Sequence, residues 1–109
     1  KKVAISYAID YPKNHLEKEH ELHLFRIFQE LINNSIRHGK AKKITINLKI
    51  DNSTLHIVYT DNGTGFDQNN PEHKKGLGMK NIESRLELLN GVITIKSTIH
   101  TGVHINMNI

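Results

Sequence analysis

The sequence contains no cysteine, and only 2 of its 109 residues are proline. Without cysteine the chain has no disulfide scaffold, no thiolate-bound metal and no cysteine nucleophile, which fits a reducing compartment. Two prolines and seven glycines exclude collagen-like and proline-rich architectures. No hydrophobic run approaches the roughly 20 residues of a membrane-spanning helix, and no stretch resembles a signal peptide. The remaining composition, 37% hydrophobic and 24% charged, predicts one globular domain with a single core.

Acidic residues are fewer than basic ones, which gives a formal net charge of +4 with histidine neutral. A basic balance favours an anionic partner such as nucleic acid, acidic lipid, acidic protein or nucleotide phosphates. The basic residues form short clusters at Arg37–Lys43 and at Lys74, Lys75 and Lys80. Because no long basic tail is present, we do not expect nucleic-acid binding, but charge alone does not choose among the other partners.

Apolar periodicity predicts the order of the elements. Apolar residues three and four apart predict a helix that ends at about His38 before Gly39; they include Leu24, Phe25, Phe28, Leu31, Ile32 and Ile36. A second helix is predicted over Met79–Leu89. Alternating residues predict strands at Val3–Tyr7, Ile44–Ile50, Leu55–Tyr59, Val92–Ser97 and Val103–Ile109. This order predicts a single α+β domain over residues 1–109, a two-layer sandwich with helices on one face of a mixed, mostly antiparallel sheet.

The first predicted helix carries a polar stripe. Glu30, Asn34 and His38 stand four residues apart, and each such step turns the helix only about 40° away from a straight line. A carboxylate beside a carboxamide oxygen suits a hard cation such as Mg²⁺, and a carboxylate can also act as a general base. The alternative is that the three residues are the solvated face of an amphipathic helix.

A glycine-containing segment, Asp61–Phe66, follows directly after a predicted strand. Gly63 and Gly65 allow the backbone to turn sharply and approach a ligand closely. An aspartate at the end of the strand can accept hydrogen bonds from an amino group, for instance on a purine. The alternative is a hairpin turn, because Asn-Gly is a strong hairpin signal, but polar loop rather than a partner strand follows.

The segment Gly76–Met79 precedes the second predicted helix. Glycines at a helix N-terminus expose backbone N–H groups to an anion, and Lys74, Lys75 and Lys80 add positive charge. A flexible hinge loop is the alternative. The pattern is neither a dinucleotide fingerprint nor a Walker loop, because the third glycine and the Gly-Lys-Ser/Thr sequence are missing.

In this order and spacing, the three segments resemble the ATP-binding domain of the GHKL superfamily of gyrase, Hsp90, histidine kinase and MutL ATPases. The residue pattern of these segments is most similar to that of the catalytic domain of two-component sensor histidine kinases. Phe25–His38 is similar to the N box, Asp61–Phe66 to the first glycine box and Gly76–Leu86 to the second. The resemblance spans about Leu24–Ile109 and implies a Bergerat-type ATPase fold that uses ATP and Mg²⁺.

The resemblance also implies roles for single residues. Glu30 would be the general base or polariser at the γ-phosphate. Asn34 would ligate the Mg²⁺ that bridges the phosphates, with Arg37 or His38 near the phosphate tail. Asp61 would accept the adenine amino group. The two glycine boxes would supply the other nucleotide contacts, at Gly63, Gly65, Phe66, Gly76, Leu77, Gly78, Met79 and Lys80.

Two features depart from the usual histidine kinase pattern. The loop Asp67–Lys75, which would be the ATP lid, is short and lacks a separate phenylalanine box, as in the short-lid families. The family usually has Gly-Thr near the C-terminus, with the threonine helping to hold adenine. Here Val103 follows Gly102 and Thr101 precedes it, so the hydroxyl that supports adenine is not identified.

The function implied is that of a protein histidine kinase catalytic domain in two-component signal transduction. It would donate the γ-phosphoryl of Mg-ATP to a histidine on a separate helical dimerisation and phosphoacceptor domain, which then serves a response regulator. No such hairpin fits before Val3. We therefore expect a domain excised from a longer chain, monomeric by itself, cytoplasmic even if its parent is membrane-anchored, and unable to phosphorylate itself.

Two other functions stay open. One is an anti-sigma-factor-type serine kinase or protein-binding switch of the same superfamily. The other is a nucleotide-binding scaffold without turnover, against which the intact Glu30, Asn34 and Asp61 argue.

Overall fold

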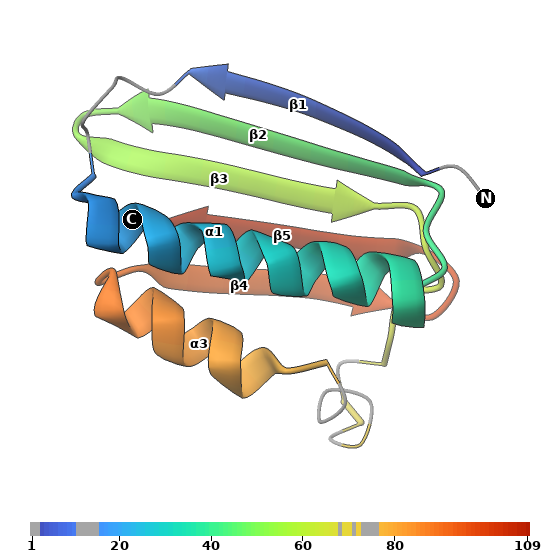
Figure 1. Cartoon of the computed structure of the whole chain (residues 1–109). Helices are drawn as coiled ribbons and strands as arrows, with labels where there is room; N and C mark the ends of the chain where they lie inside the picture. The colour runs from blue at the N-terminus through green and yellow to red at the C-terminus, as the bar shows by residue number, and fades with distance from the viewer. Residues whose placement is uncertain (1–2, 11–15, 68, 71, 73–76) are drawn as a thin grey trace.

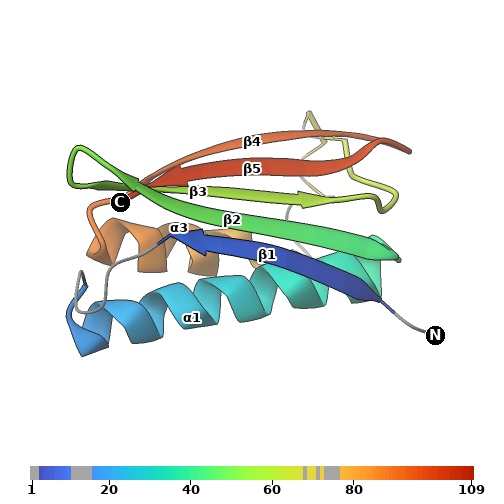
Figure 2. The same cartoon turned by 90° about the horizontal axis from the view of Figure 1, so that it is seen from above.

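The computed structural model describes residues 3–10, 16–67, 69–70, 72 and 77–109. It has a five-stranded sheet with α1 and α3 against one face, so the predicted two-layer α+β architecture is confirmed (Figures 1 and 2). The elements are β1 (Ala4–Asp10), α1 (Lys18–Asn33), the π-helix η1 (Asn34–His38), β2 (Lys43–Asp51), β3 (Thr54–Asp61), α3 (Met79–Leu88), β4 (Val92–Thr98) and β5 (Gly102–Asn108).

The sheet is mixed, with the strand order β1-β2-β3-β5-β4. β1 pairs with β2 in parallel, while the β2–β3, β3–β5 and β4–β5 pairs are antiparallel. β2 and β3 form a hairpin in which Asn52 and Ser53 both have positive φ, as in a type I′ turn. All of β1 is exposed at the outer edge of the sheet.

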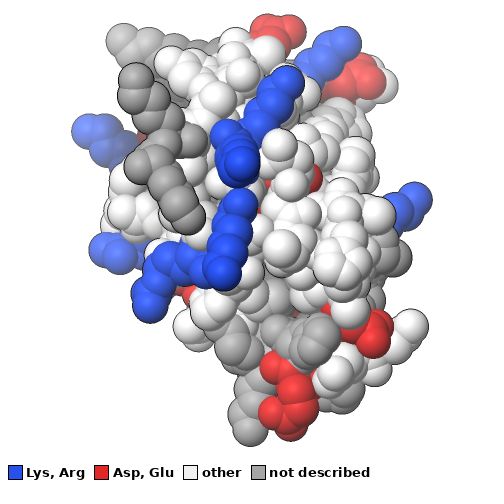
Figure 3. All heavy atoms as spheres, turned by 90° about the vertical axis from the view of Figure 1, so that its right-hand side faces the viewer, with Lys and Arg blue, Asp and Glu red and all other residues white. Residues whose placement is uncertain are grey.

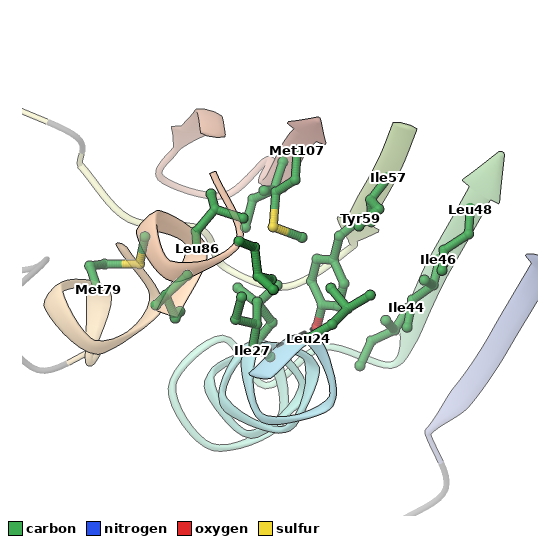
Figure 4. Close-up of a cluster of buried hydrophobic side chains, with 14 of the residues drawn as sticks. Leu24, Ile27, Ile44, Ile46, Leu48, Ile57, Tyr59, Met79, Leu86 and Met107 are labelled. Atoms are coloured by element: carbon green, nitrogen blue, oxygen red, sulfur yellow. Dashed lines mark hydrogen bonds between the residues drawn. The ribbon is translucent and has the colours of Figure 1, made fainter. Parts of the chain in front are cut away.

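The core lies between the sheet and the two helices (Figure 4). β2 and β3 alternate between buried and more exposed residues, so one face of each strand packs on the helices. The most deeply buried side chains come from both layers: Ile27, Ile44, Leu55, Ile57, Tyr59, Ile82, Leu86, Ile105 and Met107. None of the helices that the structure describes is long and apolar enough to span a membrane.

The helix α1 begins at Lys18, six residues before the first apolar residue that predicts it, and passes into η1 at Asn34. In η1 the N–H of Gly39 donates to the carbonyl of Asn34, five residues back, and the helix ends there as expected. α1 buries Leu24, Ile27 and Leu31, whereas Phe25 is 57% exposed.

The helix α3 ends at the predicted Asn90-Gly91 stop. Asn90 has a φ of 54°, and the N–H of Gly91 donates to the carbonyl of Leu86 at 2.9 Å. This bond satisfies a carbonyl group of the last turn, and the left-handed conformation of Asn90 turns the chain toward β4.

Candidate functional site

A cavity of about 330 Å³ opens where the last turns of α1 and η1 meet the end of β3 and the start of β5. Its apolar lining comes from Leu31, Tyr59, Phe66, Leu77, Met79, Ile95, Val103 and Ile105. Its polar side chains include Asn34, Ser35, His38 and Asp61. A mostly apolar pocket with a few convergent polar groups is the usual form of a small-molecule site.

The carboxylate of Asp61 is held in a fixed orientation. Its Oδ1 accepts the backbone N–H groups of Gly63 at 2.9 Å and Val103 at 3.1 Å. Its Oδ2 accepts the hydroxyl of Ser35 at 2.6 Å. Three donors among the described residues therefore occupy three of the roughly four acceptor positions of the carboxylate. The open position belongs to Oδ2, because Oδ1 already accepts two bonds, and it suits an N–H donor on a ligand.

Behind Asp61 lies a buried pair of hydroxyl groups. The Ser35 Oγ is 2.5 Å from the Tyr59 hydroxyl, which also lies 3.0 Å from the carbonyl of Leu31. Figure 4 shows the Tyr59 hydroxyl pointing from β3 toward α1. Burial raises the pKa of Tyr59 far above its ordinary value; the Ser35 hydrogen bond opposes the rise and the charge of Asp61 adds to it. The phenol is therefore neutral and able to donate.

The first glycine segment is tied to the turn after η1. The N–H of Thr64 donates to the Gly39 carbonyl at 2.8 Å. The side-chain oxygen of Asn62 accepts the N–H groups of Lys42 and Lys43 at 2.9 and 2.8 Å. These bonds fix the loop that carries the Asp61 backbone contacts relative to the end of the first helix.

Asn34 joins the first helix to the second glycine segment. Its Nδ2 donates to the carbonyl of Leu77 at 2.6 Å. With the nitrogen used in this way, the carboxamide oxygen is the atom left to meet a cation. No three His, Asp or Glu side chains gather as a metal site within the described residues. A single carboxamide oxygen fits Mg²⁺ that takes most of its other ligands from phosphates and water.

Glu30 lies outside the cavity and against the start of α3. A Cβ at Gly78 would stand 2.0 Å from the Glu30 Oε1, and Gly78 has a φ of 64°. Only glycine adopts this conformation readily and leaves room for the carboxylate. Glu30 lines a second hollow between α1 and α3, together with Arg26, Asn33, Arg85 and others. The polar stripe of the first helix therefore divides: Asn34 and His38 face the cavity, and Glu30 faces the neighbouring hollow.

The end of the molecule beside the cavity is basic. Four basic side chains are exposed in η1, in the short connection after it and at the start of β2: Arg37, Lys40, Lys42 and Lys43. Figure 3 looks onto this end, where lysine and arginine side chains gather across the middle and acidic ones lie toward the margins. Such a field attracts an anionic ligand.

Of the residues singled out from the sequence, the cavity brings together Asn34, His38, Asp61, Gly65, Phe66, Leu77 and Met79. The other described residues singled out from the sequence do not line the cavity: Glu30, Arg37, Gly63, Gly78 and Lys80. Gly76 lies outside the described residues, as do Lys74, Lys75 and other parts of the expected lid.

Sequence reasoning missed four residues that support the site. Ser35 and Tyr59 stand behind Asp61, and the backbone of Val103 holds its Oδ1. The hydroxyl of Ser97 accepts the N–H of Phe66 at 2.9 Å and donates to the carbonyl of Gly102 at 3.1 Å. Ser35 was inside the helical motif, and Tyr59 was two residues before Asp61 on an alternating strand, so their positions could have drawn attention to them.

Comparison with known proteins connects this arrangement to a large family. The sequence model of the family described as "Histidine kinase-, DNA gyrase B-, and HSP90-like ATPase" matches residues 19–109. That range includes the cavity and both glycine segments.

Curated relatives match over most of the chain. The signal transduction histidine-protein kinase/phosphatase DegS of Bacillus subtilis is 32% identical over 96 residues, which cover 86% of this chain and 25% of DegS. The sensor histidine kinase LiaS of the same organism is 34% identical over 109 residues, which cover 100% of this chain and 30% of LiaS. The chain thus spans less than a third of either relative.

Solved structures share the fold at low sequence identity. The blue-light activated histidine kinase of Erythrobacter litoralis EL346 superposes with a TM-score of 0.79 at 15% identity, over 100% of this chain and 35% of that one. A solved chain of the Acinetobacter baumannii histidine kinase AdeS gives a TM-score of 0.75 at 18% identity, over 97% of this chain and 53% of that one.

Proposed function

This chain belongs to the histidine kinase-, DNA gyrase B- and HSP90-like ATPase family, and we propose that it is the catalytic domain of a two-component histidine kinase. It binds Mg-ATP and donates the γ-phosphoryl group to a histidine on another domain. The observation that carries this proposal is the oriented Asp61 carboxylate, with one acceptor position open in the wall of an apolar cavity.

The adenine ring occupies the cavity. Its exocyclic amine donates to Asp61, and the apolar walls formed by residues such as Ile95 and Ile105 contact the ring faces. Gly65 and Phe66 line the cavity, and the backbone N–H of Gly63 holds Asp61 in place. Guanine would present a carbonyl oxygen to the same carboxylate, so the site favours adenine.

The phosphates lie toward the basic end. Asn34 holds Mg²⁺ through its carboxamide oxygen, and Arg37 or His38 meets the phosphate tail. The described part of the second glycine segment, Leu77, Gly78, Met79 and Lys80, binds the phosphates with backbone N–H groups. When bound, Mg²⁺ neutralises charge on the phosphate oxygens during transfer.

Glu30 polarises the attacking group or accepts its proton. Its carboxylate is next to Gly78, where the second glycine segment meets the helix α3. Glu30 has to reach the phosphoryl-accepting group only in the complex that contains both the acceptor and the nucleotide.

The partner domain and the larger assembly follow from the same proposal. Residues 1–109 form one catalytic domain of a longer polypeptide, whose helical dimerisation domain carries the acceptor histidine. A response regulator then takes the phosphoryl group. The domain works on the cytoplasmic side and is monomeric when isolated.

Calorimetry with ADP, ATP and GTP tests the proposal. We expect the adenine nucleotides to bind in a Mg²⁺-assisted way and GTP to bind about 10- to 150-fold more weakly, since a charge-assisted hydrogen bond contributes roughly 1.5–3 kcal/mol. Asp61→Asn should lose ADP binding, while the exposed control Asp51→Asn should not. Equal affinities for ATP and GTP, or normal ADP binding by Asp61→Asn, would refute the assignment.

A further inference from the structure

A chain of hydrogen-bonding groups runs from the core to the cavity wall. Tyr59 is 1% exposed and Ser35 is 3% exposed. The Tyr59 hydroxyl is 2.5 Å from the Ser35 Oγ, which is 2.6 Å from the Asp61 Oδ2. All three residues line the cavity, and the Tyr59 hydroxyl reaches Asp61 through Ser35. The two hydroxyl groups are therefore placed to act on a ligand that bonds to Asp61.

The number of hydroxyl protons determines which group donates in each of these hydrogen bonds. Two hydroxyl protons serve three contacts, because the carboxylate of Asp61 and the carbonyl of Leu31 only accept. If Ser35 donated to Tyr59, the contact between Ser35 and Asp61 at 2.6 Å would have no proton. If Tyr59 donates to Ser35 and Ser35 donates to Asp61, the two shortest contacts each have a proton. Only the longest contact, 3.0 Å from the Tyr59 hydroxyl to the Leu31 carbonyl, is then left with at most a shared proton. The Leu31 carbonyl also accepts the N–H of Asn34, so this order is the most favourable.

The direction determines what a ligand meets. Ser35 donates to Asp61 and accepts from Tyr59, so the Ser35 oxygen has only a lone pair left to offer. The open acceptor position of Asp61 is on Oδ2, the same oxygen that Ser35 contacts. A ligand group at this point therefore meets two acceptors and no donor. An amino group fits such a point, and a carbonyl oxygen is repelled by it.

We propose that Tyr59 is a positioning residue that, through Ser35, sets the preference of the site for a base with an amino group over one with a carbonyl group. Without the Tyr59 hydroxyl, the Ser35 proton is free to turn from Asp61 toward the ligand, where it can meet a carbonyl oxygen. Burial keeps the Tyr59 phenol protonated and donating, consistent with its raised pKa. The inference rests on the proposed function, because it needs a purine nucleotide in the cavity.

The test compares ADP with inosine diphosphate, which carries a carbonyl group where adenine carries its amine. In Tyr59→Phe, calorimetry should show weaker ADP binding and stronger inosine diphosphate binding, so that the affinity ratio falls about three- to tenfold. The matched control is Tyr7→Phe, which removes the same hydroxyl from a side chain that is 71% exposed. A purely structural role would weaken both nucleotides equally and leave the ratio unchanged, which would overturn the proposal.

A coupling experiment shows whether Tyr59 acts through Ser35. Ser35→Ala alone should lower the ratio, and Tyr59→Phe added to it should change the ratio no further. Ser35→Thr keeps a hydroxyl and should keep most of the preference. A further change of the ratio when Tyr59→Phe is added to Ser35→Ala would overturn the proposal. An unchanged ratio in Ser35→Ala alone would also overturn it, and this measurement does not need the Tyr59→Phe single variant.

The two proposals fail in different ways. If the parent chain binds neither ADP nor ATP, the proposed function is wrong and this inference falls with it. If the parent prefers ADP but the ratio is insensitive to Ser35 and Tyr59, only this inference is wrong.

Discussion

Gly63 serves the site through its backbone. Its N–H donates to Asp61, and a Cβ at this position would stand 2.6 Å from the carbonyl oxygen of Gly39. That oxygen belongs to backbone that is itself bonded to Thr64, so it has little freedom to move away. The absence of a side chain at Gly63 thus allows the loop to approach the end of the first helix.

We predict that Gly63→Ala lowers the free energy of unfolding by about 1–3 kcal/mol, the usual cost of overpacking. It should also weaken ADP binding, because the N–H that holds Asp61 must shift. Urea unfolding and calorimetry measure the two effects. The neighbouring Thr64→Ala, at an exposed position, should change neither by much. Unchanged stability in Gly63→Ala would mean that the loop does not need this close approach.

Glu30 offers a second test at the scale of one residue. We predict that Glu30→Gln binds Mg-ATP about as well as the parent, because Glu30 lies outside the cavity lining. In the proposed longer polypeptide with its acceptor histidine, phosphoryl transfer should fall about 10²- to 10⁴-fold, as for loss of a general base. Phosphohistidine formation measures the rate, with the exposed Glu83→Gln as the control. An unchanged rate would show that Glu30 is not the base.

At the scale of the element, α1 packs through a narrow face. The side chains of Leu24, Ile27 and Leu31 are buried, and Ile27 is 0% exposed. Phe28 and Ile32 pack only at its border, and Ile36 in η1 is 41% exposed. The contribution of an apolar residue in this helix therefore depends on its face rather than on its hydrophobicity.

We predict that Ile27→Ala costs about 2–5 kcal/mol of the free energy of unfolding, the range for truncating a buried aliphatic side chain. Ile36→Ala removes the same atoms from an exposed position and should cost about 0.5 kcal/mol or less. Chemical unfolding monitored by circular dichroism compares them. Similar losses in the two variants would contradict the observed burial of the helix.

The same helix shows why its face could not be chosen from the sequence. Leu24, Ile27 and Leu31 form one apolar stripe at helical spacing, and Phe25 and Phe28 begin another beside it. Both satisfy the helical period, so periodicity gives the helix but not its buried side. The buried face of β2 and β3 could be predicted, because strict alternation leaves only two faces and the apolar one is buried.

For the whole molecule, the motifs predicted which segments gather at the cavity but not the contacts between them. Asp61 and Asn34 were identified from local patterns. The bond from Ser35 to Asp61 and the one from Val103 to Asp61 join residues 26 and 42 positions apart. Such pairs depend on how the strands and the first helix pack, and no local spacing encodes them.

We predict that the isolated chain does not phosphorylate itself. Of the described histidines, only His38 lines the cavity, and it stands one turn after Asn34, in the wall that we propose to face the phosphates. An acceptor must be in line with the breaking bond, about 3 Å from the phosphorus, on the side away from ADP. Incubation with labelled ATP and analysis of acid-labile phosphate tests this. Stoichiometric phosphohistidine would make one of its own histidines the acceptor.

The wide turn of η1 has a consequence for how the chain can vary in length. Gly39 donates to a carbonyl five residues back, so this turn holds one residue more than an α-helical turn. A deletion between Asn34 and His38 would restore the tighter turn and rotate everything after it by about 100°. The tie between Gly39 and Thr64 would then be out of register. Natural relatives that bind nucleotide should therefore have their insertions and deletions outside this turn. A relative with a shortened turn should not bind nucleotide.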